Sequence, residues 1–400
     1  MSYLLLVLLV CRTLPVYRLH SSALAGVPFT AQSLLLLQVL AMQFRKLQTV
    51  VQMIWNWSRW GRSPHLQGAA IVMLSSLILS FQNIVVRVVL SPQTVLGIDF
   101  GGFIESSVGN LLLILLMRML LVVPLMTFGI APQIYPSMWK DIQTLLNERN
   151  PALIGSILAS SFLLFLSLPL MFTALSIIPA GIATTLFFIY PTVTILFAWW
   201  FFGDRPTLLL TLAVSTIYAG CLLTIPNSEQ STGNPWLGVT MAILAGVAFS
   251  GYTVLTQICT RRLRLHPVPF TLSVFVTMLI LSGLTVGAIA SLPWLSHTLP
   301  VLKIAVDPSM WPWLWASTVV LALTAIAGFL LNNIGIRRIG AAQAAIISAS
   351  GPVFTTLLGW LLIQETLQDV TQAIGILLVT LWVGAIGTGA MNQNSRNQNS

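Results

Sequence analysis

Residues 180–207 read AGIATTLFFIYPTVTILFAWWFFGDRPT, and residues 341–368 read AAQAAIISASGPVFTTLLGWLLIQETLQ. The two stretches align without a gap, and each has a proline inside an apolar run and an acidic residue just after that run. The aligned pairs are Pro191 with Pro352, Thr194 with Thr355, Leu196 with Leu357, Trp199 with Trp360 and Asp204 with Glu365. An internal duplication within apolar sequence is typical of secondary transporters built from two related halves.

The composition indicates an integral membrane protein. Hydrophobic residues make up 56% of the 400 residues and charged residues only 7%, whereas about 25% of a soluble domain is charged. A soluble fold could not cover so much apolar surface with polar side chains. The net charge of +9 comes from Lys and Arg dispersed between apolar runs, without the basic stripe of a nucleic-acid-binding protein. We therefore expect a lipid bilayer, and no nucleic acid, as a partner.

Ten apolar runs follow residue 66, each near the length of about 20 residues that spans a bilayer. They are 67–89, 109–130, 152–174, 179–202, 207–225, 236–258, 269–291, 312–335, 340–363 and 370–389. If the ten runs are spans, most Lys and Arg lie on the same side of the membrane as the N-terminus, including Lys140, 261–264 and 337–338. Because basic loops stay in the cytoplasm, we expect a multi-pass protein of the plasma (inner) membrane with both termini cytoplasmic.

The number of spans per half predicts the architecture. Five spans precede the second copy, so the second half enters the membrane in the opposite orientation. The expected fold is all-α, with ten transmembrane helices arranged as two inverted five-helix repeats over 66–226 and 235–390. Gly68 and Ser80 of the first span align with Gly238 and Ser250 of the sixth.

The two ends of the chain lie outside the repeats. Residues 1–65 form an N-terminal extension, in which 42–60 has the pattern of an interfacial amphipathic helix. The alternative is that Met42 is the true start of the protein. Residues 391–400 are a polar tail, expected to be disordered.

Residues 173–207, TALSIIPAGIATTLFFIYPTVTILFAWWFFGDRPT, resemble the EamA family of the drug/metabolite transporter superfamily. Members typically have a small-residue break after the third helix of each half, a proline inside the fourth helix and a closing Gly-Glu-Arg. Gly203, Asp204 and Arg205 match with Asp in place of Glu, and the second copy keeps only the acid, Glu365. The resemblance covers about 66–390 and implies the fold, whereas the substrates of the family range over amino acids, drugs and other metabolites.

Several residues at the repeated tract are candidates for function. Pro191 and Pro352 each remove a backbone hydrogen bond and should kink a span, either for packing or as a hinge beside a central cavity. Asp204, Arg205 and Glu365 lie at span ends, where charges reach water. We expect these three to act as gates or anchors, with proton carriage by the two acids as the alternative.

Polar residues inside other spans predict a cavity. Arg118 lies in LLLILLMRMLLVVPLM, where a charge costs about 2.5–3.5 kcal/mol on insertion scales. It either binds an anionic substrate group or snorkels or pairs structurally, unless its helix starts later than drawn. Arg87 and Gln257 accompany the polar stretches of the first and sixth spans. The other predicted cavity residues are Gln82, Asn83, Tyr190, Tyr252, Asn332, Asn333, Ser348 and Ser350, with interhelical hydrogen bonding as the alternative role of each.

No constellation of residues indicates an enzyme. HExxH, Walker A and GxSxG motifs are absent from the sequence, and Cys11, Cys221 and Cys259 lie far apart without a CxxC pair. We expect neither a metal nor a cofactor. The predicted function is secondary transport of small metabolites by alternating access between the two halves, with protons as the coupling ion. The resemblance to the family implies export, of amino-acid-like or drug-like solutes. The alternative is a non-transporting membrane scaffold or a partner subunit of a membrane complex.

Overall fold

The computed structural model describes residues 64–95, 98–148, 151–202, 234–292, 299–348 and 350–365, together with isolated residues at 215–216, 219 and within 370–378. The N-terminal extension up to residue 63, the predicted span 207–225, most of the predicted span 370–389 and the polar tail lie outside the described residues. Asp204 and Arg205 lie outside them as well.

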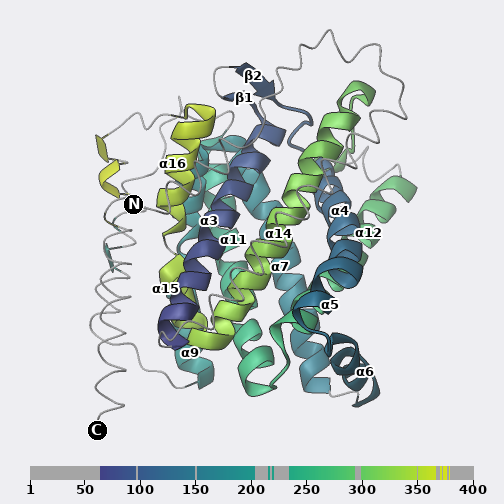
Figure 1. Cartoon of the computed structure of the whole chain (residues 1–400). Coiled ribbons are helices and arrows are strands. Elements are labelled where there is room, and N and C mark those ends of the chain that lie inside the picture. The colour runs from purple at the N-terminus through teal and green to yellow at the C-terminus, as the bar shows by residue number, and fades with distance from the viewer. Residues whose placement is uncertain are drawn as a thin grey trace. The chain divides into compact units, whose positions relative to one another are not determined.

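The described residues are nearly all helical (Figure 1). In chain order the α-helices are α3 (Pro64–Leu90), α4 (Val108–Pro124), α5 (Ala131–Ile134), α6 (Met138–Glu148), α7 (Pro151–Ile177), α8 (Ala180–Phe187), α9 (Tyr190–Phe202), α11 (Pro235–Gln257), α12 (Pro267–Ser291), α14 (Trp311–Ile339), α15 (Ala341–Ser348) and α16 (Gly351–Ile363). The π-helical segments η1 (Leu125–Ile130) and η3 (Ile258–Arg262) continue α4 and α11. Short 3₁₀ turns are η4 (Pro300–Leu302) and η5 (Pro308–Met310).

A small antiparallel hairpin connects α3 to α4. Its strands are β1 (Pro92–Val95) and β2 (Ile98–Gly101), with Pro92 opposite Gly101. Phe100 of this hairpin packs edge-on against Trp313 at the start of α14, with ring centroids 5.4 Å apart. The hairpin therefore lies at the end of the bundle where α3 ends and α14 begins (Figure 1).

Seven stretches of the described residues are long and apolar enough to cross a bilayer. They are Leu66–Leu90, Val108–Ile134, Pro151–Ile177, Pro235–Arg262, Pro267–Ser291, Pro308–Ile339 and Ala341–Ile363. Each corresponds to one of the ten predicted spans. The predicted span 179–202 corresponds to two shorter helices, α8 and α9. The chain is thus a helical, multi-pass integral membrane protein.

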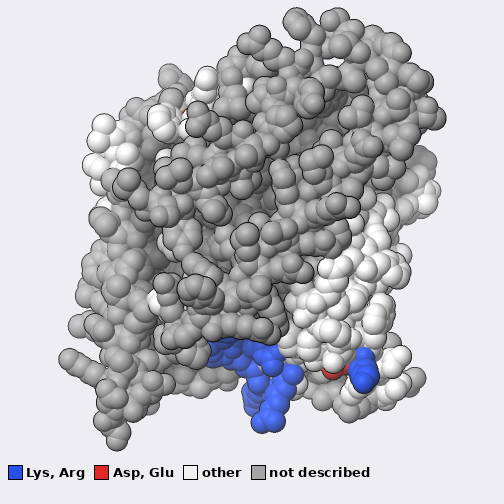
Figure 2. Space-filling model, in the orientation of Figure 1, with Lys and Arg blue, Asp and Glu red and all other residues white. Residues whose placement is uncertain are grey.

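Polar caps and prolines fix where the long helices begin. The Ser107 hydroxyl accepts from the Asn110 amide at the start of α4, and the Asn234 side chain accepts from the Trp236 amide before α11. Proline at the first turn of a helix loses no intrahelical hydrogen bond, which suits Pro235. Basic residues lie in the last turns of η3 and α14, where they complement the helix dipole. On the face shown in Figure 2, the described Lys and Arg side chains gather at one end of the bundle.

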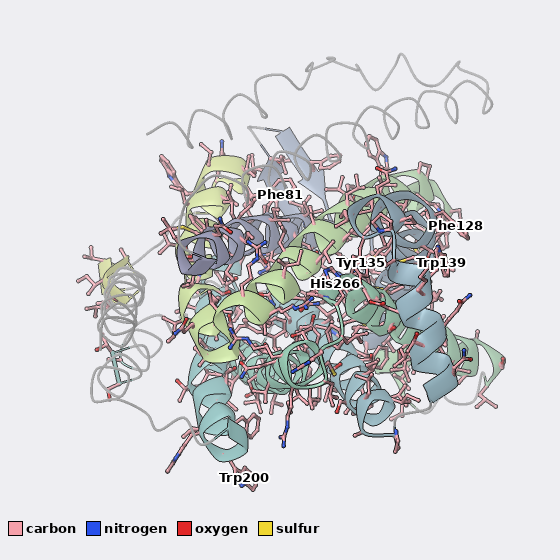
Figure 3. All side chains as sticks on the ribbon, turned by 60° about the horizontal axis from the view of Figure 1, so that its bottom comes forward. Phe81, Phe128, Tyr135, Trp139, Trp200 and His266 are labelled. Carbon is pink, nitrogen blue, oxygen red and sulfur yellow. The ribbon has the colours of Figure 1, made fainter. Side chains whose placement is uncertain are left out.

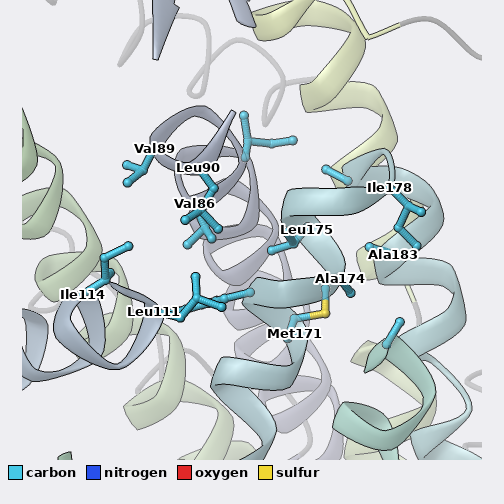
Figure 4. Packing of buried hydrophobic residues seen from close by; sticks show 14 of the residues in the cluster. Val86, Val89, Leu90, Leu111, Ile114, Met171, Ala174, Leu175, Ile178 and Ala183 are labelled. Carbon is cyan, nitrogen blue, oxygen red and sulfur yellow. The ribbon is translucent and has the colours of Figure 1, made fainter. Parts of the chain in front are cut away.

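The interior is packed by apolar side chains from helices distant in sequence. Figure 4 shows one cluster in which Val86 of α3, Leu111 of α4 and Leu175 of α7 lie together. Small residues allow the closest approaches: a Cβ added to Gly68 would collide with Ile339, and one added to Gly238 would lie 2.9 Å from the Ile178 side chain. Close packing at glycine is the usual way in which membrane helices gain van der Waals contact.

Candidate functional site

Two of the predicted spans are broken in the middle. The span 179–202 consists of α8 and α9, separated at residues 188–189, and the span 340–363 consists of α15, which ends at Ser348, and α16, which begins at Gly351. Pro191 and Pro352 are each the second residue of the later helix. The helical hydrogen bonding is thus interrupted at the two prolines that were predicted to remove a backbone hydrogen bond. Proline has no N–H for the carbonyl four residues before it, and its ring crowds that carbonyl, so neither the Phe187 nor the Ser348 carbonyl accepts the usual helical hydrogen bond.

The two breaks lie against one another and against the first helix of each half. A Cβ on Gly351 would lie 2.9 Å from the Phe188 ring, which places the breaks in contact. Ser76 of α3 donates to the Ser348 carbonyl over 3.0 Å, and Ser80 donates to the Gly351 carbonyl over 3.0 Å. The Ser348 carbonyl cannot accept from Pro352, which has no N–H, so the α3 helix satisfies it instead.

The α11 helix packs closely against the first break, as α3 does against the second. A Cβ on Gly246 would collide with the Phe187 carbonyl oxygen, so only a glycine permits this contact. Tyr190, just after the break, is buried and donates to the Ala345 carbonyl of α15 over 3.3 Å. Its ring packs edge-on against Phe249, with centroids 5.1 Å apart.

Several residues predicted to line a cavity form hydrogen bonds within the described helices. The Tyr252 hydroxyl donates to Asn333 Oδ1 over 2.7 Å, and Asn333 Nδ2 donates to the Thr271 hydroxyl over 2.9 Å. These three residues tie α11, α12 and α14 together. Gln82 accepts from the Thr324 hydroxyl over 3.5 Å, and Ser350 donates to the Ile347 carbonyl within its own turn.

Asn83 and Asn332 have no such network among the described residues. Asn83 is half-buried on α3. Asn332 is buried on α14, and its Nδ2 has no hydrogen-bond partner in the part of the chain that the structure describes.

Glu365 closes the junction between α7 and α8. Its Oε1 lies 3.3 Å from Arg87 Nε, and its Oε2 accepts from the Ala180 amide over 3.0 Å. Arg87 Nη1 in turn donates to the Leu175 carbonyl over 2.7 Å. The ion pair thus satisfies a carbonyl at the end of α7 and an amide at the start of α8. This pairing was not predicted from sequence, although both residues fall at the ends of their apolar runs.

A corresponding arrangement holds the junction between α14 and α15. Arg261 donates to the carbonyls of Arg337 over 2.8 Å and Arg338 over 2.7 Å, and Gln257 accepts from the Ala341 amide. The residue between the helices is Gly340, whose φ of 94° favours glycine. Sequence analysis singled out Gln257 only as a polar residue of the sixth span.

Arg118 differs from Arg87, the other buried charged residue of the described structure. Because α4 begins at Val108, the alternative of a later helix start is wrong, and Arg118 lies well inside the span. Its side chain is 0% exposed, and Nε, Nη1 and Nη2 have no hydrogen-bond partner among the described residues. Its Cζ lies 5.6 Å from the centre of the Phe172 ring on α7. Snorkelling to the surface is excluded by this burial.

Comparison with known proteins agrees with this fold. The model of the EamA-like transporter family matches residues 236–387. The uncharacterized transporter sll1319 of Synechocystis sp. is 40% identical over 328 residues, which cover 80% of this chain and 93% of that protein. This chain belongs to the EamA-like transporter family.

More distant proteins are similar over most of the chain. The uncharacterized transporter YcbK of Bacillus subtilis is 27% identical over 271 residues, 66% of this chain and 78% of that protein. A crystal structure with 18% identity aligns with a TM-score of 0.50 over 83% of this chain and 99% of its own, which shows the shared fold. The family model and the match to sll1319 are consistent with the drug/metabolite transporter superfamily, and membership in a transporter family implies a protein that is not an enzyme.

Proposed function

We propose that this EamA-like protein is a secondary transporter of small metabolites that works by alternating access between two inverted halves. The halves are residues 66–226 and 235–390, each with five spans. The site lies where the two broken helices meet, and the two breaks at Pro191 and Pro352 are the observation that carries the proposal. Broken helices with free backbone groups near the middle of the bilayer are a recurring substrate site in transporters with inverted repeats.

Corresponding contacts in the two halves support the repeat. Gly68 packs on Ile339 as Gly238 packs on Ile178, and Ser76 approaches the Ser348 carbonyl as Gly246 approaches the Phe187 carbonyl. In the aligned repeats, Ile178 is equivalent to Ile339, and Phe187 is equivalent to Ser348. The α3 helix therefore packs against the α14–α15 junction and the second break in the same manner as α11 packs against the α7–α8 junction and the first break.

The Arg87–Glu365 pair supports a gating role at one end of the bundle. Glu365 belongs to the second half, whereas Arg87 and the Ala180 amide belong to the first. Moving one half away from the other at this end requires these contacts to break. We assign this end to the outer side because the basic residues of η3 and α14 lie at the opposite ends of their helices.

The coupling ion is proposed from the motifs of the sequence, and the direction of transport is proposed from the family. The sequence has no Walker A motif, so an ion gradient, with protons first, is the proposed energy source. Export across the plasma membrane, of amino-acid-like or drug-like solutes, is the direction and substrate range expected of the family. We also propose that both termini lie in the cytoplasm.

Reconstitution tests the proposal. The purified full-length protein in liposomes should exchange at least one solute of a broad metabolite panel faster than protein-free liposomes when a proton gradient is imposed. The variant Pro352→Ala, which allows α15 and α16 to join, should fold but transport more slowly. If no solute moves, or if Pro191→Ala and Pro352→Ala leave a cellular tolerance phenotype unchanged at normal abundance, the scaffold alternative replaces transport.

A further inference from the structure

We infer that Arg118 binds the carboxylate group of a small, otherwise apolar substrate, with the Phe172 ring against the guanidinium. This inference rests on the proposed transport function and names the class of solute. It starts from a buried cation whose N–H donors are unused by the described protein. An arginine cannot lose its charge in a protein, and its planar fork matches a carboxylate in two parallel hydrogen bonds.

The contrast with Arg87 shows how this chain satisfies a buried arginine. Arg87 and Arg118 are the two cations inside the ten apolar runs. Arg87 is 5% exposed and has a carboxylate and a backbone carbonyl as partners. Arg118 is more deeply buried, at 0%, and among the described residues it has only the face of an aromatic ring. A ring face attracts the cation but accepts no hydrogen bond from the guanidinium edge.

The sequence supplies no acid at the depth of Arg118. The chain has nine Asp and Glu residues, and all of them fall outside the ten apolar runs. Arg118 lies ten residues after the start of α4, which corresponds to roughly 15 Å of helix at 1.5 Å per residue. A counterion that reaches this depth therefore comes from outside the chain, and a substrate is the natural source.

The position of Phe172 links Arg118 to the broken helices. Ser167 of α7 donates to the Ala245 carbonyl over 2.8 Å, and the adjacent Gly246 touches the first break at Phe187. Phe172 is five residues further along α7, a rise of about 7.5 Å. The Arg118–Phe172 pair thus lies within one to two helical turns of the layer in which the breaks meet.

The side chains around Arg118 indicate which class of anion it binds. Leu111 and Ile114, one to two turns before Arg118 on α4, belong to the same buried apolar cluster as Met171 beside Phe172 (Figure 4). A single cation among apolar side chains matches a singly charged carboxylate on an apolar body. A phosphate dianion would need further cations, and Arg87 already has its partner. The π-helical segment η1 follows Arg118 within the same span, and such segments often occur at functional sites.

Thermal unfolding of the ligand-free protein tests whether Arg118 is structural. We compare the wild type with Arg118→Met and with Arg87→Met as the matched control, in the same detergent. Arg118→Met should unfold at the same temperature as the wild type or higher, because an unpaired buried charge is removed. Arg87→Met should unfold several degrees lower, because Glu365 loses its partner. An equal loss in both variants would overturn the inference.

Binding identifies the anion. The probes are hexanoate, benzoate and 4-methyl-2-oxopentanoate, the amides hexanamide and benzamide, and inorganic phosphate. At least one carboxylate should bind the wild type, its amide should not, and Arg118→Met should weaken binding about 10- to 100-fold, the range for charge-assisted hydrogen bonds. Arg118→Lys should recover part of the affinity. Binding of no carboxylate, or of phosphate alone, would overturn the carboxylate assignment.

Transport separates the two proposals. If Arg118→Met moves the same solute as the wild type at the same rate, the Arg118 inference fails while the transport function stands. If the wild type binds a carboxylate through Arg118 but moves no solute in liposomes, the transport function fails while the binding site stands.

Discussion

At the scale of single residues, Glu365 has two roles that one substitution separates. Its carboxylate pairs with Arg87, and it also caps the start of α8 through the Ala180 amide. A glutamine keeps an oxygen that accepts from this amide but removes the charge. The first role depends on charge and the second only on a hydrogen-bond acceptor.

Glu365→Gln should therefore lower the free energy of unfolding by about 1–3 kcal/mol, since Arg87 is left buried with an uncharged partner. Glu365→Ala should lower it further, because the α8 amide also loses its acceptor. Unfolding temperatures in detergent measure both effects. The control is Glu105→Gln at an exposed acid, which should change little. A loss in the control equal to that in Glu365→Gln would contradict the ion-pair account.

His266 is a second residue whose surroundings decide its chemistry. It precedes α12, where its Nδ1 accepts from the Val268 amide over 3.3 Å. Its ring stacks on Tyr135, with centroids 3.9 Å apart, as Figure 3 shows. Burial, reinforced by the charge of Arg337 and opposed by Asp141, lowers the pKa of His266 from 6.5 to about 4. The neutral imidazole is the form that caps the helix.

Stability should therefore fall as the pH is lowered from 6.5 to 4. In this window the unfolded chain binds a proton at His266 that the folded protein does not, which favours unfolding as pH falls. We expect about 1–2 kcal/mol, reduced because the side chain is partly exposed. His266→Asn keeps a capping side chain without titrating, so its unfolding temperature should fall less over this window. Parallel curves for the two proteins would contradict the role of His266.

At the scale of elements, the breaks depend on neighbours that leave room for them. Hydropathy predicted apolar spans over 179–202 and 340–363, and the structure has two short helices in each. A hydropathy pattern reports transfer into lipid and does not distinguish a continuous helix from a broken one. The second break is stabilised by Ser76 of α3, which donates to the Ser348 carbonyl, and the first break is accommodated by Gly246 of α11, which leaves room for the Phe187 carbonyl.

Gly246 provides the test at this scale. In Gly246→Ala the new Cβ meets the Phe187 carbonyl oxygen, so we expect a loss of about 1–3 kcal/mol from overpacking. Gly287→Ala is the matched control, since nothing lies within 4 Å of its Cβ, and alanine should add about 0.5–1 kcal/mol in a helix. Unfolding temperatures should thus shift in opposite directions. A shift of the same sign in both variants would contradict the contact between α11 and the first break.

At the scale of the whole molecule, contacts define which segments share an end of the bundle. Ser107 at the start of α4 donates to the Lys303 carbonyl over 2.7 Å, and Asn110 accepts from the Ala305 amide over 3.0 Å. Glu365 joins the same end through Arg87, at the close of α3. At the other end of the span 108–134, Tyr135 donates to Asp141 over 3.0 Å.

Reporter fusions test the inverted arrangement at this scale. Fusions after Ser106 and after Lys140 calibrate the two sides of the membrane. A fusion after Glu365 should report the outer side together with Ser106, and a fusion after Asp204 should report the cytoplasmic side together with Lys140. Both repeats carry an acid at the same aligned position, so this outcome follows only if the halves are inverted. Reports of one common side for Asp204 and Glu365 would contradict the arrangement.

The sequence by itself determined three things: that this chain is a membrane protein, which residues form most of its spans, and to which family it belongs. Composition, run length and the duplicated tract are local properties, and transfer from water to lipid depends on them residue by residue. Only the tertiary structure decided which buried polar groups have partners. Arg87 pairs with Glu365 and a carbonyl of α7, and Tyr252 pairs with Asn333. In the part of the chain that the structure describes, Arg118 contacts the Phe172 ring and has no hydrogen-bond partner. Hydrogen bonds act over about 3 Å, so partners far apart in the chain are set by how helices pack.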